Sequence, residues 1–216
     1  MGMKFLSRFS QQKLVAQRKK AGFRDKEIGV CFSLAVNWLS IMYRDRGTTA
    51  QSESRMLQLY AKHGGSIGGA TYLLQSLFMR RHAQDINDAQ RIVLNARGLK
   101  MYKTAFEHRR YNIKDLWVVL NQPERHGILY NIYYKQNEKL TGHSIAFFKK
   151  NERDKKFSTF KSNTSFIAFD PNYGEWEIDA TRDDTWKFVN YLSSQLYRSL
   201  IRNDLVYVEP QSNRFS

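Results

Sequence analysis

The spacing of apolar residues changes halfway along the chain, and this change limits the fold more than any other feature. In residues 31–44, apolar side chains such as Leu34 and Trp38 recur at the three- and four-residue spacing of a helix. Residues 127–135 instead alternate aromatic and β-branched side chains with others, which favours a strand. We therefore expect an α+β fold, with N-terminal helices packed on an antiparallel sheet.

The same spacing rules predict the other elements, and they place most helices before most strands. The further predicted helices are residues 10–21, 51–62, 69–81, 86–96, 114–121 and 183–200. The further predicted strands are residues 142–150, 165–170, 175–179 and 205–208.

Length and charge limit the class of protein. A chain of 216 residues with only 3 prolines and 12 glycines has no room for a long linker, so we expect a single main domain. The net charge of +15 suggests an acidic partner, which could be nucleic acid, an anionic membrane or an acidic protein surface, although many domains are basic for solubility alone. The basic residues are scattered over separate elements, so we expect no specific nucleic-acid partner.

Targeting and cofactor motifs are missing from the sequence. No window approaches the roughly 20 apolar residues of a membrane span, and the N-terminus has no signal-peptide core. The histidines outside the motifs below have no metal-ligand spacing, and we expect neither metal nor cofactor. The glycine-rich residues 64–69 resemble a phosphate-binding loop, but no predicted strand precedes them and no Gly-Lys-Ser/Thr follows, so we expect no nucleotide site.

Cys31 is the only cysteine, which excludes an internal disulfide and indicates a reducing or redox-indifferent compartment. It follows Gly29-Val30, a break in the chain, and it opens the predicted helix 31–44. The dipole and free N–H groups of a helix N-terminus stabilise a thiolate. A free cysteine is also often just a small buried hydrophobe, so Cys31 alone does not establish a catalytic thiol.

His143 and Asp170 lie on two predicted strands that a charged loop, residues 150–164, would join as a hairpin. If His143 lies opposite Asp170, then Ile145 faces Ala168 and Phe147 faces Phe166. Directly opposed residues point to the same face, so this register gathers the polar pair and the apolar side chains together. The carboxylate would then orient the imidazole beside the thiol, as the third member of a triad does.

Three motifs carry a resemblance to a known family. They are Gly-Val-Cys-x-x-Leu-x-x-x-Trp-Leu from Gly29, Gly-His-x-x-x-Phe-Phe from Gly142, and Phe-Asp-Pro-Asn-Tyr-Gly-Glu from Phe169. With these three motifs, the chain resembles the YopT/AvrPphB family of papain-fold cysteine proteases, which are bacterial effectors delivered into host cells. The resemblance implies that Cys31 is the nucleophile, His143 the general base and acid, and Asp170 the residue that orients the imidazole.

The resemblance also implies an arrangement of domains, a substrate and a location. Residues 1–24 would form an N-terminal helical segment, and residues 25–216 the papain-like protease domain. The substrate would be a host protein such as a small GTPase or a kinase. The protein would be secreted by a bacterium without a Sec signal peptide and act in the host cytosol, at or near a membrane; failing that, it would be cytoplasmic.

The sequence leaves two features unassigned, the second oxyanion donor and the type of reaction. The backbone N–H of Cys31 is one natural oxyanion donor, but papain-like enzymes add a side-chain amide just before the nucleophile, where this chain has Arg24-Asp25-Lys26-Glu27. Gln11, Gln12, Gln17, Lys26 or a second backbone N–H could supply the missing donor. Besides a protease, two other functions are compatible with the sequence. The same triad also serves deamidases, transglutaminases and acyltransferases, and the chain could also be a non-catalytic basic interaction module.

Overall fold

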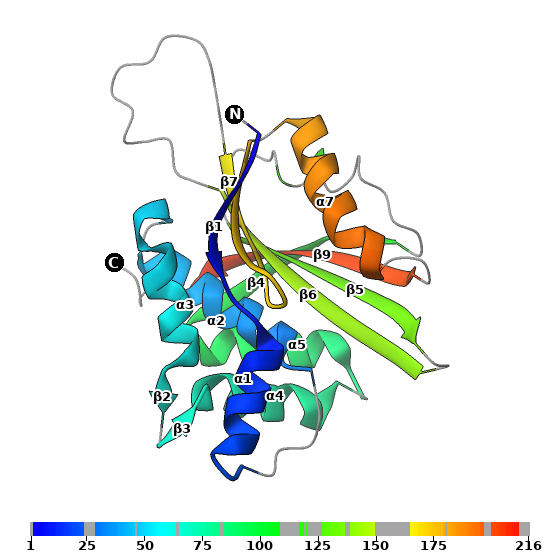
Figure 1. Cartoon of the computed structure of the whole chain (residues 1–216). Helices are drawn as coiled ribbons and strands as arrows, with labels where there is room; N and C mark the ends of the chain where they lie inside the picture. Colours follow the sequence, from blue (N-terminus) through cyan, green and yellow to red (C-terminus); the bar gives the residue numbers. More distant parts are fainter. Residues whose placement is uncertain are drawn as a thin grey trace.

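The computed structural model shows a mixed sheet-and-helix architecture (Figure 1). The described residues are 2–23, 29–45, 47–63, 65–82, 84–108, 117–118, 120, 127–136, 139–149, 165–179, 181–196 and 200–211.

Helices dominate the first half of the chain, as the spacing predicts. Helix α2 begins at Cys31 with Val30 as its N-cap, and residues 31–42 are all buried. The helices are α1 (Gln11–Lys20), α2 (Cys31–Arg44), α3 (Ser52–Tyr60), α4 (Gly69–Arg81), α5 (Ile86–Ala96) and α7 (Arg182–Leu196), with a short 3₁₀ helix η1 (Thr49–Gln51) before α3.

Seven strands form one antiparallel sheet in the order β1-β8-β7-β6-β5-β9-β4, and two very short strands pair separately. The strands of the large sheet are β1 (Met3–Arg8), β4 (Leu99–His108), β5 (Gly127–Gln136), β6 (Lys139–Lys149), β7 (Ser165–Asp170), β8 (Gly174–Asp179) and β9 (Leu200–Pro210). The small pair is β2 (Lys62–His63) and β3 (Ser66–Ile67).

The sheet has a hydrophobic core on each face. Helices α1 to α5 gather on one side of it, and α7 lies on the other (Figure 1). On the first side, Trp38 and neighbouring α2 side chains pack with Ala146 and Phe148 of β6. On the second side, Phe188 of α7 packs with Ile145 and Phe147. Alternation along β6 thus sends successive side chains into two different cores.

Most predicted elements are confirmed, and α2, α4, α5 and β7 have the predicted bounds. Strands β1 and β4 were missed. Both are edge strands with register irregularities, between Phe5 and Ser7 in β1 and at two places in β4, which interrupt the period-two pattern on which strand prediction depends. Of the predicted helix 114–121, only residues 117, 118 and 120 are described, and all three are helical; the predicted loop 150–164 lies outside the described residues.

The N-terminal half contains two short structural features that were not predicted from the sequence, the strands β2 and β1. The two-residue strand β2 precedes the glycine-rich segment, so the expectation of no strand there was wrong. Residues 1–24 contain α1, as predicted, and also β1, which pairs with β8 at the edge of the large sheet. The division between residues 24 and 25 falls at the start of a stretch outside the described residues and stays a prediction.

Candidate active site

Cys31 lies at the first position of α2, next to the strand that carries His143. The cysteine is 8% exposed, and its thiol donates to the carbonyl oxygen of Gly142, with Sγ 3.7 Å from that oxygen. The N-cap Val30 offers no side-chain hydrogen bond to the helix. The first N–H groups of this helix therefore have no side-chain cap.

His143 and Asp170 form a buried hydrogen-bonded pair. Nε2 of His143 is 3.0 Å from Oδ1 of Asp170, and the two side chains are 3% and 0% exposed. Oδ1 also accepts the backbone N–H of Asn172 at 2.8 Å, which fixes the carboxylate over the following turn. Because Nε2 is held by the carboxylate, Nδ1 is the imidazole nitrogen left for the thiol.

The predicted register between β6 and β7 is wrong by two residues. Phe147 pairs with Ala168, and Ala146 with Phe169, where the pairing ends. If this register continues, Asp170 lies opposite Ile145. His143, two residues before Ile145 on β6, then contacts Asp170 diagonally across the two strands. A shift of two residues keeps every side chain on its predicted face, whereas a shift of one would have separated the pair.

The surroundings of His143 favour its charged form. Burial alone lowers the pKa of the imidazole, but attraction to Asp170, the hydrogen bond with it and the interactions with Cys31 together raise that pKa from 6.5 to about 10. Oδ2 of Asp170 is buried and has no hydrogen-bond partner within the described residues, so the imidazolium is the main compensation for this carboxylate. The arrangement is that of an imidazolium held between a carboxylate and a thiol.

Glu175, the last residue of the Asp170 motif, forms a buried ion pair that sequence reasoning missed. Its two carboxylate oxygens accept hydrogen bonds from Nε and Nη2 of Arg55, at 2.7 and 2.8 Å. Both side chains are 0% exposed. It also accepts from Ser52 at 2.6 Å and from the indole N–H of Trp38. The contact with Trp38 ties the Asp170 turn to the helix that begins at Cys31.

Gln11 contacts the turn that follows Asp170. Its backbone N–H donates to Pro171 at 2.7 Å, and its side-chain amide donates to Oδ1 of Asn172 at 2.6 Å. Gln11 therefore holds the turn that orients Asp170. Lys26, another candidate donor for the oxyanion, lies outside the described residues, so the second donor stays unassigned.

Two aromatic residues near the site have different roles. Tyr134 of β5 was not singled out from sequence, yet the pKa of its hydroxyl is raised, first by burial and then by the charge of Cys31. Trp176 packs edge-on against Phe5 and lies in the apolar layer with Phe188, where it fills the sheet face as expected.

Within the described residues, no cluster of three or more His, Cys, Asp or Glu side chains could hold a metal ion. Among the helices in that part of the chain, none has the length and hydropathy needed to cross a bilayer.

The fold and motifs define a papain-like protein of the cysteine protease type, and comparison with known families agrees. The family Peptidase_C58, described as the Yersinia/Haemophilus virulence surface antigen family, matches residues 4–209. The chain belongs to this family, which includes the YopT/AvrPphB-type cysteine protease effectors. A comparison with curated proteins gives no match.

Two solved structures are similar to this chain. One is the Pseudomonas avirulence protein AvrPphB, at 17% identity and a TM-score of 0.56, over 84% of this chain and 92% of that one. The other is PatoxP, a cysteine protease-like domain of the Photorhabdus asymbiotica toxin PaTox, at 13% identity and a TM-score of 0.39, over 94% of this chain and 59% of that one. The likeness to AvrPphB supports the papain-like α+β fold.

Proposed function

We propose that this chain is a cysteine endopeptidase whose catalytic triad is Cys31, His143 and Asp170. The observation that carries the proposal is the buried pair of His143 and Asp170, with 3.0 Å between Nε2 and Oδ1, beside a thiol at a helix N-terminus. A thiolate next to an imidazolium is the reactive form of a catalytic cysteine.

The chemistry follows from these positions. The Cys31 thiolate attacks the carbonyl carbon of the scissile peptide bond, and the backbone N–H of Cys31 is a donor to the resulting oxyanion. As the C–N bond breaks, His143 gives its proton to the leaving amine, which leaves a thioester on Cys31. His143 then takes a proton from water, which attacks the thioester, releases the new carboxyl end and restores the thiolate.

Family membership supports a host protein as the substrate, reached after secretion from a bacterium. The net charge of +15 favours docking on an acidic protein surface or an anionic membrane. Residues 25–216 would then form the protease domain, preceded by the segment 1–24 that contributes β1 and α1.

Mapping of new protein N-termini tests this function. Wild-type protein and the Cys31→Ala variant are each incubated with a host-cell lysate at matched concentration. We expect new N-termini with the wild type alone. Modified glutamines without cleavage would identify deamidase or transferase chemistry instead, and identical lysates with both proteins would contradict an enzymatic role.

A further inference from the structure

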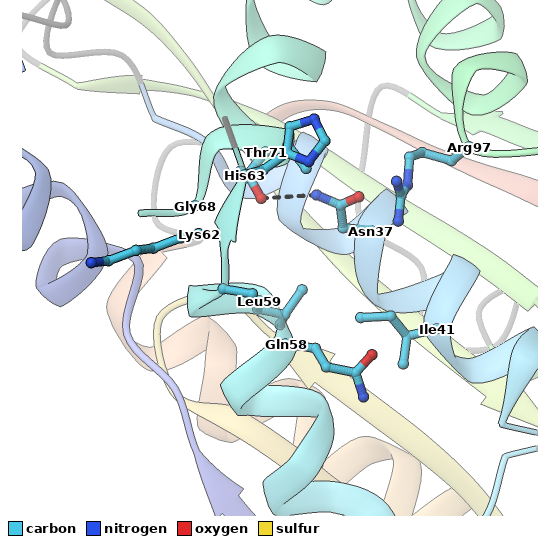
Figure 2. Close-up of a pocket in the computed structure, with 11 residues that line it drawn as sticks. Asn37, Ile41, Gln58, Leu59, Lys62, His63, Gly68, Thr71 and Arg97 are labelled. Carbon is cyan, nitrogen blue, oxygen red and sulfur yellow. Dashed lines mark hydrogen bonds between the residues drawn. The ribbon is translucent and has the colours of Figure 1, made fainter. Parts of the chain in front are cut away.

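A small cavity lies on the helical side of the molecule, and none of its lining residues belongs to the proposed triad. It has a volume of about 140 Å³ and is bordered by α2, α3, β2, the start of α4 and the end of α5. Pockets that enclose drug-sized molecules measure roughly 300–1,000 Å³, so this one fits only a small ligand or one chemical group of a larger ligand. Figure 2 shows Asn37, Thr71 and Arg97 converging on it from three elements.

The ionisable side chains around this cavity are all basic. Lys62, His63 and Arg97 line it, and no carboxylate is among the described lining residues. Nε of Arg97 is buried and has no hydrogen-bond partner in the described part of the chain. Burial, followed by repulsion from Arg44, lowers the pKa of the Arg97 guanidinium, as expected for a partly buried cation near a second cation.

A second buried polar group at the same cavity, the Asn37 amide, has one atom without a hydrogen-bond partner among the described residues. Asn37 is 4% exposed and donates Nδ2 to the Thr71 hydroxyl at 2.8 Å, while its Oδ1 has no partner among the described residues. The Thr71 hydroxyl can donate as well as accept. The Asn37 side-chain amide can therefore rotate by half a turn, so that Oδ1 accepts a hydrogen bond from Thr71. In that orientation its NH₂ group has donors directed into the cavity.

The start of α4 adds backbone donors. Ala70 and Thr71, in the first turn of this 13-residue helix, line the cavity, and the N-cap Gly68 provides no side-chain cap. Gly68 has φ +61°, and an added Cβ would lie 2.8 Å from Leu14, so glycine is required at this turn. Free N–H groups and the positive end of a helix dipole attract phosphate-type anions.

We infer that this cavity binds a small tetrahedral oxyanion, either free phosphate or the phosphoryl group of a larger molecule. Arg97 supplies the charge-assisted hydrogen bonds, the first turn of α4 supplies backbone donors, and Lys62 and His63 stand at the rim. The site is smaller than the nucleotide site that the glycine-rich segment resembles, and it is independent of the proposed protease activity.

Calorimetric titration of the purified protein with inorganic phosphate, at ionic strength matched with chloride, tests the site. We expect saturable binding to the wild type and at least about tenfold weaker binding to Arg97→Gln, because a hydrogen bond to a charged group is lost. Arg81→Gln, which removes the same charge from the exposed end of α4, is the matched control and should bind like the wild type.

A further variant and a further probe complete the experiment. Lys62 is exposed at the rim of the cavity, so Lys62→Gln should fold normally. It should still weaken phosphate binding, and it therefore tests the site even if Arg97→Gln fails to fold. Phosphoserine compared with phosphate distinguishes a carried phosphoryl group, which would bind more tightly, from the free ion. Absence of saturable phosphate binding, or equal affinity in the wild type, Arg97→Gln and Lys62→Gln, would overturn the inference.

Discussion

Glu175 accepts a hydrogen bond from the indole N–H of Trp38, and this contact joins two of the three sequence motifs inside the core. Trp38 lies two turns along the helix that begins at Cys31, and Glu175 lies five residues after Asp170. The ion pair with Arg55 completes the same cluster. The motif residues around the proposed triad therefore have a structural role, which is to fix the start of α2 relative to the turn after Asp170.

The buried ion pair predicts an unequal cost of removing two arginines. Arg55→Met should destabilise the fold by about 3–5 kcal/mol, because it leaves the Glu175 carboxylate buried without its partner. Arg91→Met is the control, since Arg91 pairs with Asp88 on an exposed surface and should cost about 0–1 kcal/mol. Urea unfolding measures both, and equal losses would contradict the importance of the buried pair.

Gly174 predicts a sharp backbone effect. Its φ is +119°, and an added Cβ would lie 2.0 Å from the carbonyl oxygen of Ser7 on β1. Gly174→Ala should therefore displace β1 from β8 and cost on the order of 1–3 kcal/mol or more in unfolding free energy. Gly29→Ala, where an added Cβ meets nothing within 4 Å, should be nearly neutral. A Gly174→Ala protein as stable as Gly29→Ala would refute this packing.

Asp170→Asn tests the role of the carboxylate. Asparagine keeps an oxygen that can accept the N–H of Asn172, so the fold should be retained, and most Cys31 alkylation with it. Turnover should fall by about 10²- to 10⁴-fold, because the imidazolium loses its charged partner. Steady-state kinetics on a substrate found in the lysate experiment measures this loss. Full activity of Asp170→Ala would show that the carboxylate has been assigned wrongly.

The raised pKa of His143 predicts a pH-dependent stability. Between the unfolded value of 6.5 and the folded value of about 10, the native imidazole holds a proton that the unfolded chain has lost. The contribution is complete below 6.5 and disappears as pH rises toward 10, with a slope of at most about 1.4 kcal/mol per pH unit. Urea unfolding at pH 7 and pH 9.5 should show a larger loss for the wild type than for Asp170→Asn. Identical losses would contradict a protonated native imidazole.

How far the sequence predicts this protein depends on which interactions determine each feature. The bounds of α2 were predictable because Gly29-Val30 interrupts the chain and the helix is buried along one continuous apolar pattern. The pairing of His143 with Asp170 was predictable to the correct sheet face, because alternation is local. The register was not, since it depends on contacts with the neighbouring strands and on the connection between β6 and β7.

Long-range polar contacts were beyond sequence reasoning. Nothing local indicates that Arg55 ends beside Glu175, 120 residues later, or that Gln11 donates to Asn172. The tail of the Asp170 motif was the available signal, because a glutamate after an apolar strand and a glycine turn needs a partner if it is buried. The cationic cavity was similarly hidden, since its lining comes from five separate elements.

The proposed protease chemistry requires an activated Cys31 thiol, and the alkylation rate of Cys31 at pH 6 measures that activation. The rate with iodoacetamide is measured for the wild type, for His143→Gln and for a free peptide thiol, with labelling at Cys31 located by mass spectrometry. We expect the wild type to react much faster than the peptide thiol and His143→Gln to lose this advantage. A wild-type Cys31 that reacts no faster than the peptide thiol would contradict the assignment of Cys31 as the nucleophile.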